Sequence, residues 1–132
     1  MEDWTKRETV IAFCKGLSPE VREDYPFHDD NWTVMRHWQN KKAFAFLYER
    51  EGHIWVNVKC SPEWLLFWRD TYPAVRPAYH MNKAHWNTIV LDGSVPPEAS
   101  RTCWRKAGGS PRQKERRTIH AENRMPLIQL QG

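Results

Sequence analysis

The stretch AFAFLYEREGHIWVNVK, residues 43–59, decides the fold of this chain. Its first arm alternates, and one side carries the aromatic residues Phe44, Phe46 and Tyr48. Its second arm alternates too, and one side carries the aliphatic residues Ile54, Val56 and Val58. Between the arms, Glu51–Gly52 is a short turn signal. A period of two is typical of strands with one buried and one wet face, so the stretch predicts an antiparallel hairpin packed on a core.

Two flanking segments predict further strands, and two others are expected to be irregular. Residues 32–38 are rich in β-forming side chains and extend the hairpin to a three-stranded meander. Residues 86–91 predict another strand later in the chain. The acidic segment that ends in YPFHDDNW (25–32) is expected to be a connector, because its proline, aspartates and asparagine favour a turn. Residues 74–78 are expected to form a loop.

Three helices are expected from their start and stop signals. Thr5 and Glu8 have the spacing of a capping box, and Gly16 is a natural end for the helix that follows them. Ser61–Pro62 supplies an N-cap hydroxyl and a first-turn proline to a second helix. One face of that helix is expected in the core, with Trp64, Phe67 and Trp68. Residues 96–107 predict a third helix that begins at a pair of prolines.

Length and composition indicate one globular domain. The chain has 132 residues, of which 40% are hydrophobic, and this is enough for a single core. Cys14, Cys60 and Cys103 are odd in number and widely spaced, which indicates neither a disulfide framework nor a zinc site. The first residues, MEDWTKRETV, lack the apolar region of a signal peptide, and no apolar run is long enough to span a bilayer. We therefore expect a soluble cytoplasmic protein without a membrane partner or a cofactor.

The positive charge is unevenly distributed. The formal net charge is +4, but residues 101–132 hold 8 basic and 2 acidic side chains, so this last quarter of the chain carries more than the whole excess. Residues 31–92 hold 8 basic and 5 acidic side chains and four histidines. We expect a domain over residues 1–107 and a disordered basic tail over residues 108–132, which could bind nucleic acid without sequence preference. A basic face on the middle of the domain is also possible.

The segment YHMNKAHWNT, Tyr79–Thr88, is the densest polar cluster of the chain and contains no acid. It is either a loop whose Asn and His side chains cap its own backbone, or a surface that contacts phosphates and bases. Lys41 and Lys42 at a hairpin tip could contact a phosphate backbone like a wing, or be ordinary solvated lysines. The candidate nucleic-acid-binding residues are Lys41, Lys42, Lys59, Arg76, His80, Asn82, Lys83 and His85.

Three segments carry a resemblance to a known family: EDYPFHDDNWTVMRH (23–37), IWVNVKCSPEW (54–64) and RPAYHMNKAHWNTIVLDGSVP (76–96). Over roughly residues 6–100 the chain resembles the MmcQ/YjbR family of small bacterial proteins. The resemblance implies about five strands with helices on one face, similar in outline to secretion-chaperone-like domains, and a DNA-binding role. The chain departs from the family at EASRTCWRKAGGSPRQKE (98–115), where the final helix is shortened and interrupted by glycine.

We therefore expect an α+β, two-layer domain with a mainly antiparallel sheet of about five strands packed against two to three helices. The first functional hypothesis is a non-enzymatic protein that binds double-stranded DNA through the 76–86 loop and the hairpin at residues 41–42. The second is a protein-interaction or chaperone-like module that presents the aromatic face of its sheet to another protein. The third is a small-ligand, metal or catalytic site around Cys60, His80 and His85.

Overall fold

The predicted hairpin forms the centre of a six-stranded antiparallel sheet, with strand order β1-β2-β3-β4-β6-β5. The computed structural model describes residues 3–109. The strands are β1 (Val21–Asp24), β2 (Thr33–His37), β3 (Lys42–Arg50), β4 (His53–Lys59), β5 (Val75–Pro77) and β6 (Trp86–Val90). Gly52, with φ of 83°, helps to form the turn between β3 and β4, since glycine adopts positive φ without strain.

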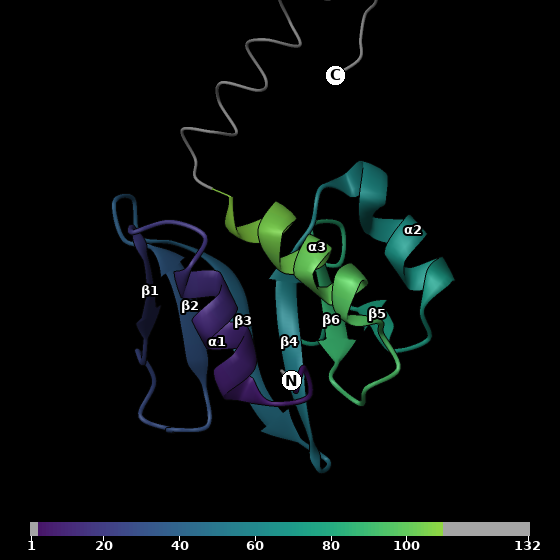
Figure 1. The fold of residues 1–132 in the computed structure, drawn as a ribbon, viewed down its shortest axis with the longest axis horizontal. Helices are drawn as coiled ribbons and strands as arrows, with labels where there is room; N and C mark the ends of the chain where they lie inside the picture. The colour runs from purple at the N-terminus through teal and green to yellow at the C-terminus, as the bar shows by residue number, and fades with distance from the viewer. Residues whose placement is uncertain (1–2, 110–132) are drawn as a thin grey trace, which may run out of the picture.

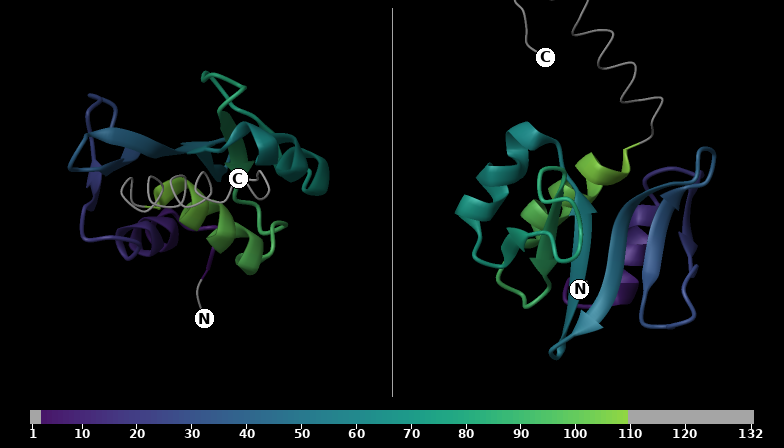
Figure 2. Two further views of the ribbon diagram at one scale, coloured as in Figure 1. Left: turned by 90° about the horizontal axis from the view of Figure 1, so that it is seen from above. Right: turned by 180° about the vertical axis from the view of Figure 1, so that it is seen from behind.

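The helices form the second layer. α1 (Arg7–Lys15) and α3 (Pro97–Gly108) pack on one face of the sheet, and α2 (Pro62–Thr71) lies beside the edge formed by β5 and β6 (Figures 1 and 2). The helix-side core includes Val10, Cys14, Leu65, Trp68, Cys103 and Trp104, all buried. Within residues 3–109, no helix is long and apolar enough to cross a membrane.

The alternation of β4 decides what each face of the sheet carries. Val56 and Val58 are buried in the core. Trp55, Asn57 and Lys59 alternate with them and therefore point away from α1 and α3. We call this second side the open face. Within residues 3–109 no helix covers it, and the loop that follows β5 rises above it in Figure 2. The sheet therefore has one side sealed by helices and one side built from aromatic and polar side chains.

The predicted fold class is confirmed: the chain is α+β with an antiparallel sheet and its helices in one layer. The expected connector contains β1, and the expected loop contains β5. Both are edge strands of the sheet, and only the first residue of each, Val21 and Val75, is buried. One apolar residue cannot produce a visible alternation, so neither strand had a sequence signal.

Two expected helix features are wrong. α1 begins after Lys6, and its N-cap side chain makes no capping bond. The Thr5 hydroxyl donates to the Asp3 carboxylate instead, so the capping box does not form. On α2, Trp68 is buried, but Trp64 and Phe67 are 40% and 48% exposed. The expected aromatic core face of this helix is thus only partly buried, because α2 lies at the edge of the sheet.

Phe44 departs from the alternation predicted for its strand. The pairing of β2 with β3 shifts register between Met35 and Arg36, and this bulge inserts an extra residue into β3. Phe44 then lies on the helix side, where its ring contacts His37 and comes within 3 Å of a Cβ placed on Gly108. The predicted end of α1 at Gly16 is confirmed, and so are the predicted starts of α2 at Pro62 and of α3 at Pro97. The predicted tail lies outside the described residues from position 110 onward.

Candidate functional site

A buried polar network anchors the 76–86 loop to the open face. The Asn57 side chain is 1% exposed, and its Oδ1 accepts hydrogen bonds from the Tyr48 hydroxyl at 2.9 Å and the Thr88 hydroxyl at 2.6 Å. Asn57 Nδ2 donates to the Tyr79 carbonyl at 2.9 Å, and the Tyr79 amide donates to Thr88 Oγ1 at 2.8 Å. Burial raises the pKa of Tyr48 to about 12, so its hydroxyl stays protonated and remains a donor. The start of the loop is therefore fixed.

The rest of the loop is held by its own backbone and by α2. Asn82 Oδ1 accepts a hydrogen bond from the Ala84 amide at 2.8 Å. Asn82 thus caps the backbone of its own loop, which was one of the two roles expected for the polar side chains of this segment. The Arg69 guanidinium donates to the Lys83 carbonyl at 2.6 Å and to Asn87 Oδ1 at 2.7 Å. The sequence analysis did not single out Arg69. Because it lies on α2, its role depends on a contact between distant segments.

The backbone of the loop is held in place, but several of its side chains are exposed to solvent. Lys83 and His85 are exposed. His80 is exposed too and has a φ of 61°, in the left-handed region, and its ring lies 4.0 Å from that of Tyr79. The loop is thus rigid in its main chain and presents three basic or titratable side chains.

Two cations of the open face lie at the ring of Trp55. The Arg50 guanidinium lies 4.8 Å from the Trp55 ring centre and 4.2 Å from that of Tyr79. Arg76 reaches the same Trp55 ring at 5.3 Å. Tyr48 stacks against Tyr79 with ring centres 6.1 Å apart. We call these five residues the Trp55 cluster. Two guanidinium groups at one ring produce a local positive potential, because a ring attracts a cation without neutralising its charge.

A second group of the same kind lies at the other end of β4. Lys59 Nζ is 5.6 Å from the ring centre of Trp86, and Trp86 packs edge-on against Phe46 at 5.6 Å. Lys59 pairs with Trp86, and Phe46 pairs with Asn57, in the register of the sheet. Directly paired residues of antiparallel strands point to the same side, so these three residues, the Trp86 cluster, share the open face.

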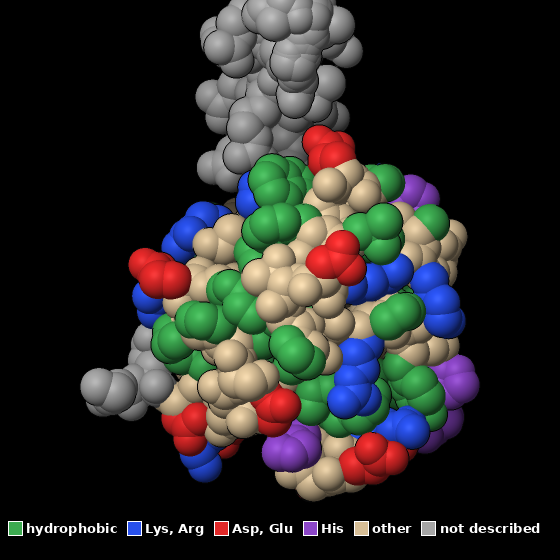
Figure 3. Space-filling view, turned by 90° about the vertical axis from the view of Figure 1, so that its right-hand side faces the viewer, with side chains coloured by type: hydrophobic (Ala, Val, Ile, Leu, Met, Phe, Trp, Pro, Cys, Tyr) green, Lys and Arg blue, Asp and Glu red, His purple; other side chains and the backbone are tan. Residues whose placement is uncertain are grey.

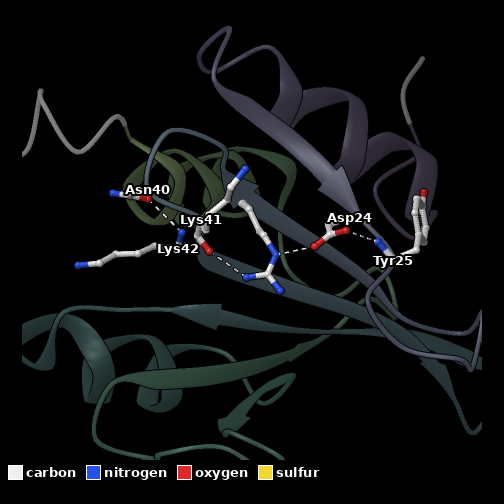
Figure 4. A network of polar contacts seen from close by, with 6 residues as sticks. Asp24, Tyr25, Asn40, Lys41 and Lys42 are labelled. Carbon is white, nitrogen blue, oxygen red and sulfur yellow. Dashed lines mark hydrogen bonds and ion pairs between the residues drawn. The ribbon is translucent and has the colours of Figure 1, made fainter.

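A third group lies at the turn between β2 and β3. Lys41 Nζ is 3.4 Å from the ring centre of Trp38, and the Arg22 guanidinium is 5.3 Å from it. These three residues form the Trp38 cluster. Lys41 is therefore held against a ring. Lys42 is exposed at the start of β3, and its backbone amide donates to Asn40 (Figure 4).

Carboxylates are scarce beside these clusters. Asp24 pairs with Arg36 at 2.8 Å, and Arg36 also donates to the Lys41 carbonyl at 2.9 Å (Figure 4). The turn residue Glu51 lies 3.5 Å from Arg50, with its side chain 68% exposed. Seen from the side of α2 and β5, Lys, Arg and His side chains alternate with hydrophobic ones (Figure 3). The open face thus keeps an excess of positive charge.

Half of the sequence-predicted residues lie against aromatic rings of this face: Lys41, Lys59, Arg76 and His80. Lys42 lies at the turn, and Asn82, Lys83 and His85 lie in the loop. The sequence analysis missed Arg50 and Arg22. Arg50 could have been found, because the alternation of β3 places it on the same side as Phe46 and Tyr48. Arg22 lies in β1, for which the sequence offered no signal.

The alternative centred on Cys60 receives no support from its surroundings. The Cys60 amide donates to the His85 carbonyl at 2.9 Å, so the two backbones are close. Burial, however, raises the pKa of the Cys60 thiol, which opposes the thiolate that a nucleophile or metal ligand requires. Across residues 3–109, no three His, Cys, Asp or Glu side chains gather as a metal site would require.

Known proteins with similar sequences and folds have been described. Residues 18–106 match the YjbR family model. The uncharacterised YjbR protein of Escherichia coli is 41% identical over 88 residues, which cover 67% of this chain and 74% of that protein. The uncharacterised YyaQ protein of Bacillus subtilis is 34% identical over 104 residues, 68% of this chain and 84% of its own. A Deinococcus radiodurans crystal structure has a TM-score of 0.73 at 23% identity, and covers 87% of this chain and 89% of its own. This chain belongs to the YjbR family.

Proposed function

We propose that this protein binds nucleic acid through the open face of its sheet and acts as a binding protein without catalysis. The observation that carries the proposal is the arrangement of the three clusters. Each holds at least one cation within 6 Å of an aromatic ring, and the register of the sheet places Arg22, Trp55 and Lys59, one residue from each cluster, on the open face. Cations bind phosphates, and rings bind bases, so one surface offers partners for both parts of a nucleotide.

Some cations of the open face differ from those of the helix side in having no carboxylate partner. On the helix side, Lys15 pairs with Glu23 at 2.9 Å and Arg101 pairs with Glu98 at 3.0 Å. On the open face, Lys59 and Arg76 lie against rings, and within residues 3–109 neither forms an ion pair with a carboxylate. A carboxylate cancels the charge of a cation, whereas a ring leaves it available to a phosphate. The open face is therefore the better surface for a polyanion.

The proposal keeps the predicted contact segments and enlarges them. The 76–86 loop and the hairpin at residues 41–42 border the open face, and the strands between them add Arg50 and Lys59. The absence of catalysis is part of the proposal and is supported by the raised pKa of the Cys60 thiol. Fixed side chains also favour binding, because less conformational entropy is lost when the ligand arrives.

The test is a salt titration of affinity with the full chain and a fluorescent oligonucleotide. Lys59→Gln combined with Arg76→Gln removes two open-face charges. The plot of log K against log salt has a negative slope, and its steepness should decrease by about two units, since each phosphate contact contributes about one unit. Binding by the basic tail contributes equally to every variant and cancels in the comparison.

Lys15→Gln combined with Lys106→Gln is the matched control. It removes the same charge from the helix side, and Lys106 also lies against a tryptophan ring, 5.2 Å from Trp64. The slope of this control should exceed that of the open-face variant by about one to two units. Equal slopes for both double variants, or no binding of the wild-type chain at low salt, would refute the proposal.

Contact with another protein is a second candidate, favoured by the surface of α2. Trp64 and Phe67 are 40% and 48% exposed, and their rings pack edge-on with centres 5.3 Å apart, so they form an apolar patch on one helix. Such patches commonly take part in protein contacts. Sedimentation of the wild-type chain and of Phe67→Ser over a range of concentrations would detect self-association through this patch. If the chain is a monomer at all concentrations, the patch on α2 does not mediate self-association, and only contact with a different protein would remain as its role.

A further inference from the structure

We infer that the open face takes a single strand of nucleic acid in preference to a duplex. This inference rests on the proposed function and names its ligand more closely. It follows from the rings of the face, whereas the proposed function follows mainly from its charges. A single strand exposes the flat sides of its bases, and these stack on aromatic side chains with little dependence on sequence. In a duplex the same surfaces are stacked inside the helix and are out of reach.

Exposed aromatic rings lie at two opposite ends of the open face. Trp38 is 36% exposed at the turn between β2 and β3, next to Lys41 and Arg22. At the opposite end of β2, Phe27 is 50% exposed and packs edge-on against Trp32. Between these ends lie rings that are partly or fully buried, so the accessible rings rest on a rigid aromatic base.

That base is a row of rings that crosses the sheet. Trp32 stacks on Tyr48 with ring centres 4.3 Å apart and an angle of 24° between the rings. Tyr48 stacks in turn on Tyr79 at 28°. Phe46 precedes Tyr48 by two residues on β3, which places the two side chains about 7 Å apart along the strand. Trp86 and Phe46 are half-buried, so their outer edges reach solvent.

Cations accompany three of the tryptophan rings of this surface. Lys41 and Lys59 lie 3.4 Å and 5.6 Å from Trp38 and Trp86, and Arg76 lies 5.3 Å from Trp55. A duplex placed on the face would reach these charges but would leave the rings without partners. A single strand uses both, with phosphates on the cations and bases on the rings. The charge complementarity and the rings together therefore favour the single strand.

Within residues 3–109, the open face carries no helix that could enter the groove of a duplex. Proteins that read duplex DNA commonly place a helix or a β-ribbon in a groove. α1 and α3 pack against the sheet on its other side. The exposed side of α2 carries an apolar patch, with Glu63 and Asp70 also exposed. A negatively charged and apolar helix surface would not enter a groove.

The experiment compares three probes on the full chain by fluorescence anisotropy: an oligodeoxythymidine, a duplex of the same length, and an abasic strand of the same length. The oligodeoxythymidine should bind more tightly than either of the others. Trp38→Leu should weaken its binding by about five- to a hundredfold with the salt slope unchanged, because a stacking contact contributes about 1–3 kcal/mol. Trp64→Leu is the matched control, since Trp64 is similarly exposed and has Lys106 at its ring. It should leave the affinity unchanged.

The outcomes separate the two proposals. If the duplex binds as tightly as the single strand, or if the abasic strand equals the oligodeoxythymidine, the inference of a single-stranded ligand is wrong while nucleic-acid binding stands. If no probe binds at low salt, both proposals are wrong. Should Trp38→Leu fail to fold, the comparison of the abasic strand with the oligodeoxythymidine on the wild-type chain still decides the question.

Discussion

The Asn57→Ala substitution should be among the most damaging single changes in this protein. Asn57 takes part in three hydrogen bonds that join β3, β6 and the 76–86 loop: with Tyr48, with Thr88 and with the Tyr79 carbonyl. The side chain is 1% exposed, so water cannot replace these partners without rearrangement. The substitution therefore removes the bonds and also leaves buried groups unsatisfied.

The size of the effect follows from this count. Three net hydrogen-bond contributions of about 1 kcal/mol each give about 3 kcal/mol. The Tyr48 hydroxyl, left buried without its acceptor, adds about 1 kcal/mol or more. A loss of about 4 kcal/mol is a large part of the 5–15 kcal/mol typical of a whole domain. For a domain of this size it corresponds to a decrease in Tm of roughly 15–30 °C.

Urea unfolding followed by tryptophan fluorescence would measure this loss. Asn40→Ala is the matched control, because Asn40 is an exposed asparagine whose side chain accepts one bond, from the Lys42 amide. It should cost less than about 1 kcal/mol. A second variant, Thr88→Val, should fall between the two, and its coupling with Asn57→Ala in a double-mutant cycle should exceed about 0.5 kcal/mol. If Asn57→Ala costs no more than Asn40→Ala, the network does not stabilise the loop and this reasoning fails.

Three further predictions follow from other parts of the structure. Gly108→Ala should destabilise the protein by about 1–3 kcal/mol although alanine favours helix, because the new Cβ would lie 2.7 Å from the Phe44 ring; Gly16→Ala, without such a clash, should be nearly neutral in urea unfolding. Burial raises the pKa of the Cys14 thiol from 9.0 to about 12, so the unfolded chain loses this proton at lower pH than the folded chain does. The free energy of unfolding should therefore decrease between pH 9 and about 12. Cys14→Ala should make this decrease smaller by about 1 kcal/mol per pH unit. Titration of the reaction of Cys60 with a thiol reagent should give a pKa above the ordinary value, and a value below 8 would revive the catalytic alternative.

The central part of the fold was predictable because its side chains repeat with a clear period. The alternation of residues 53–59 correctly separated Val56 and Val58 from Trp55 and Asn57. The same method failed at Phe44, because a bulge depends on the register with the neighbouring strand and leaves no local pattern. It also missed β1 and β5, each of which buries only its first residue.

The candidate site was predictable only in part, for a similar reason. Residue type and loop context pointed to Lys41, Lys59 and Arg76, and each lies against a ring of the open face. The rings themselves come from other strands, and a sequence does not show which strands are neighbours. Asn57 was placed on the wet side of its strand, but its burial under the loop depends on Tyr79, 22 positions later.

The stacking of cations on rings gives the open face a property that ion pairs would not. Lysine and arginine side chains lie against the rings of Trp38, Trp55 and Trp86, and their stems cover part of the apolar ring surface. The same cations keep their charge, because a ring does not neutralise it. An arriving phosphate can therefore draw the cation away from the ring, and the uncovered ring can then contact a base. The base replaces the cation as the partner of the ring. A face built in this way stays hydrated when it is free and offers both kinds of contact when a strand binds. This exchange gives a role to the position of Lys41, Lys59 and Arg76 against aromatic rings of the open face.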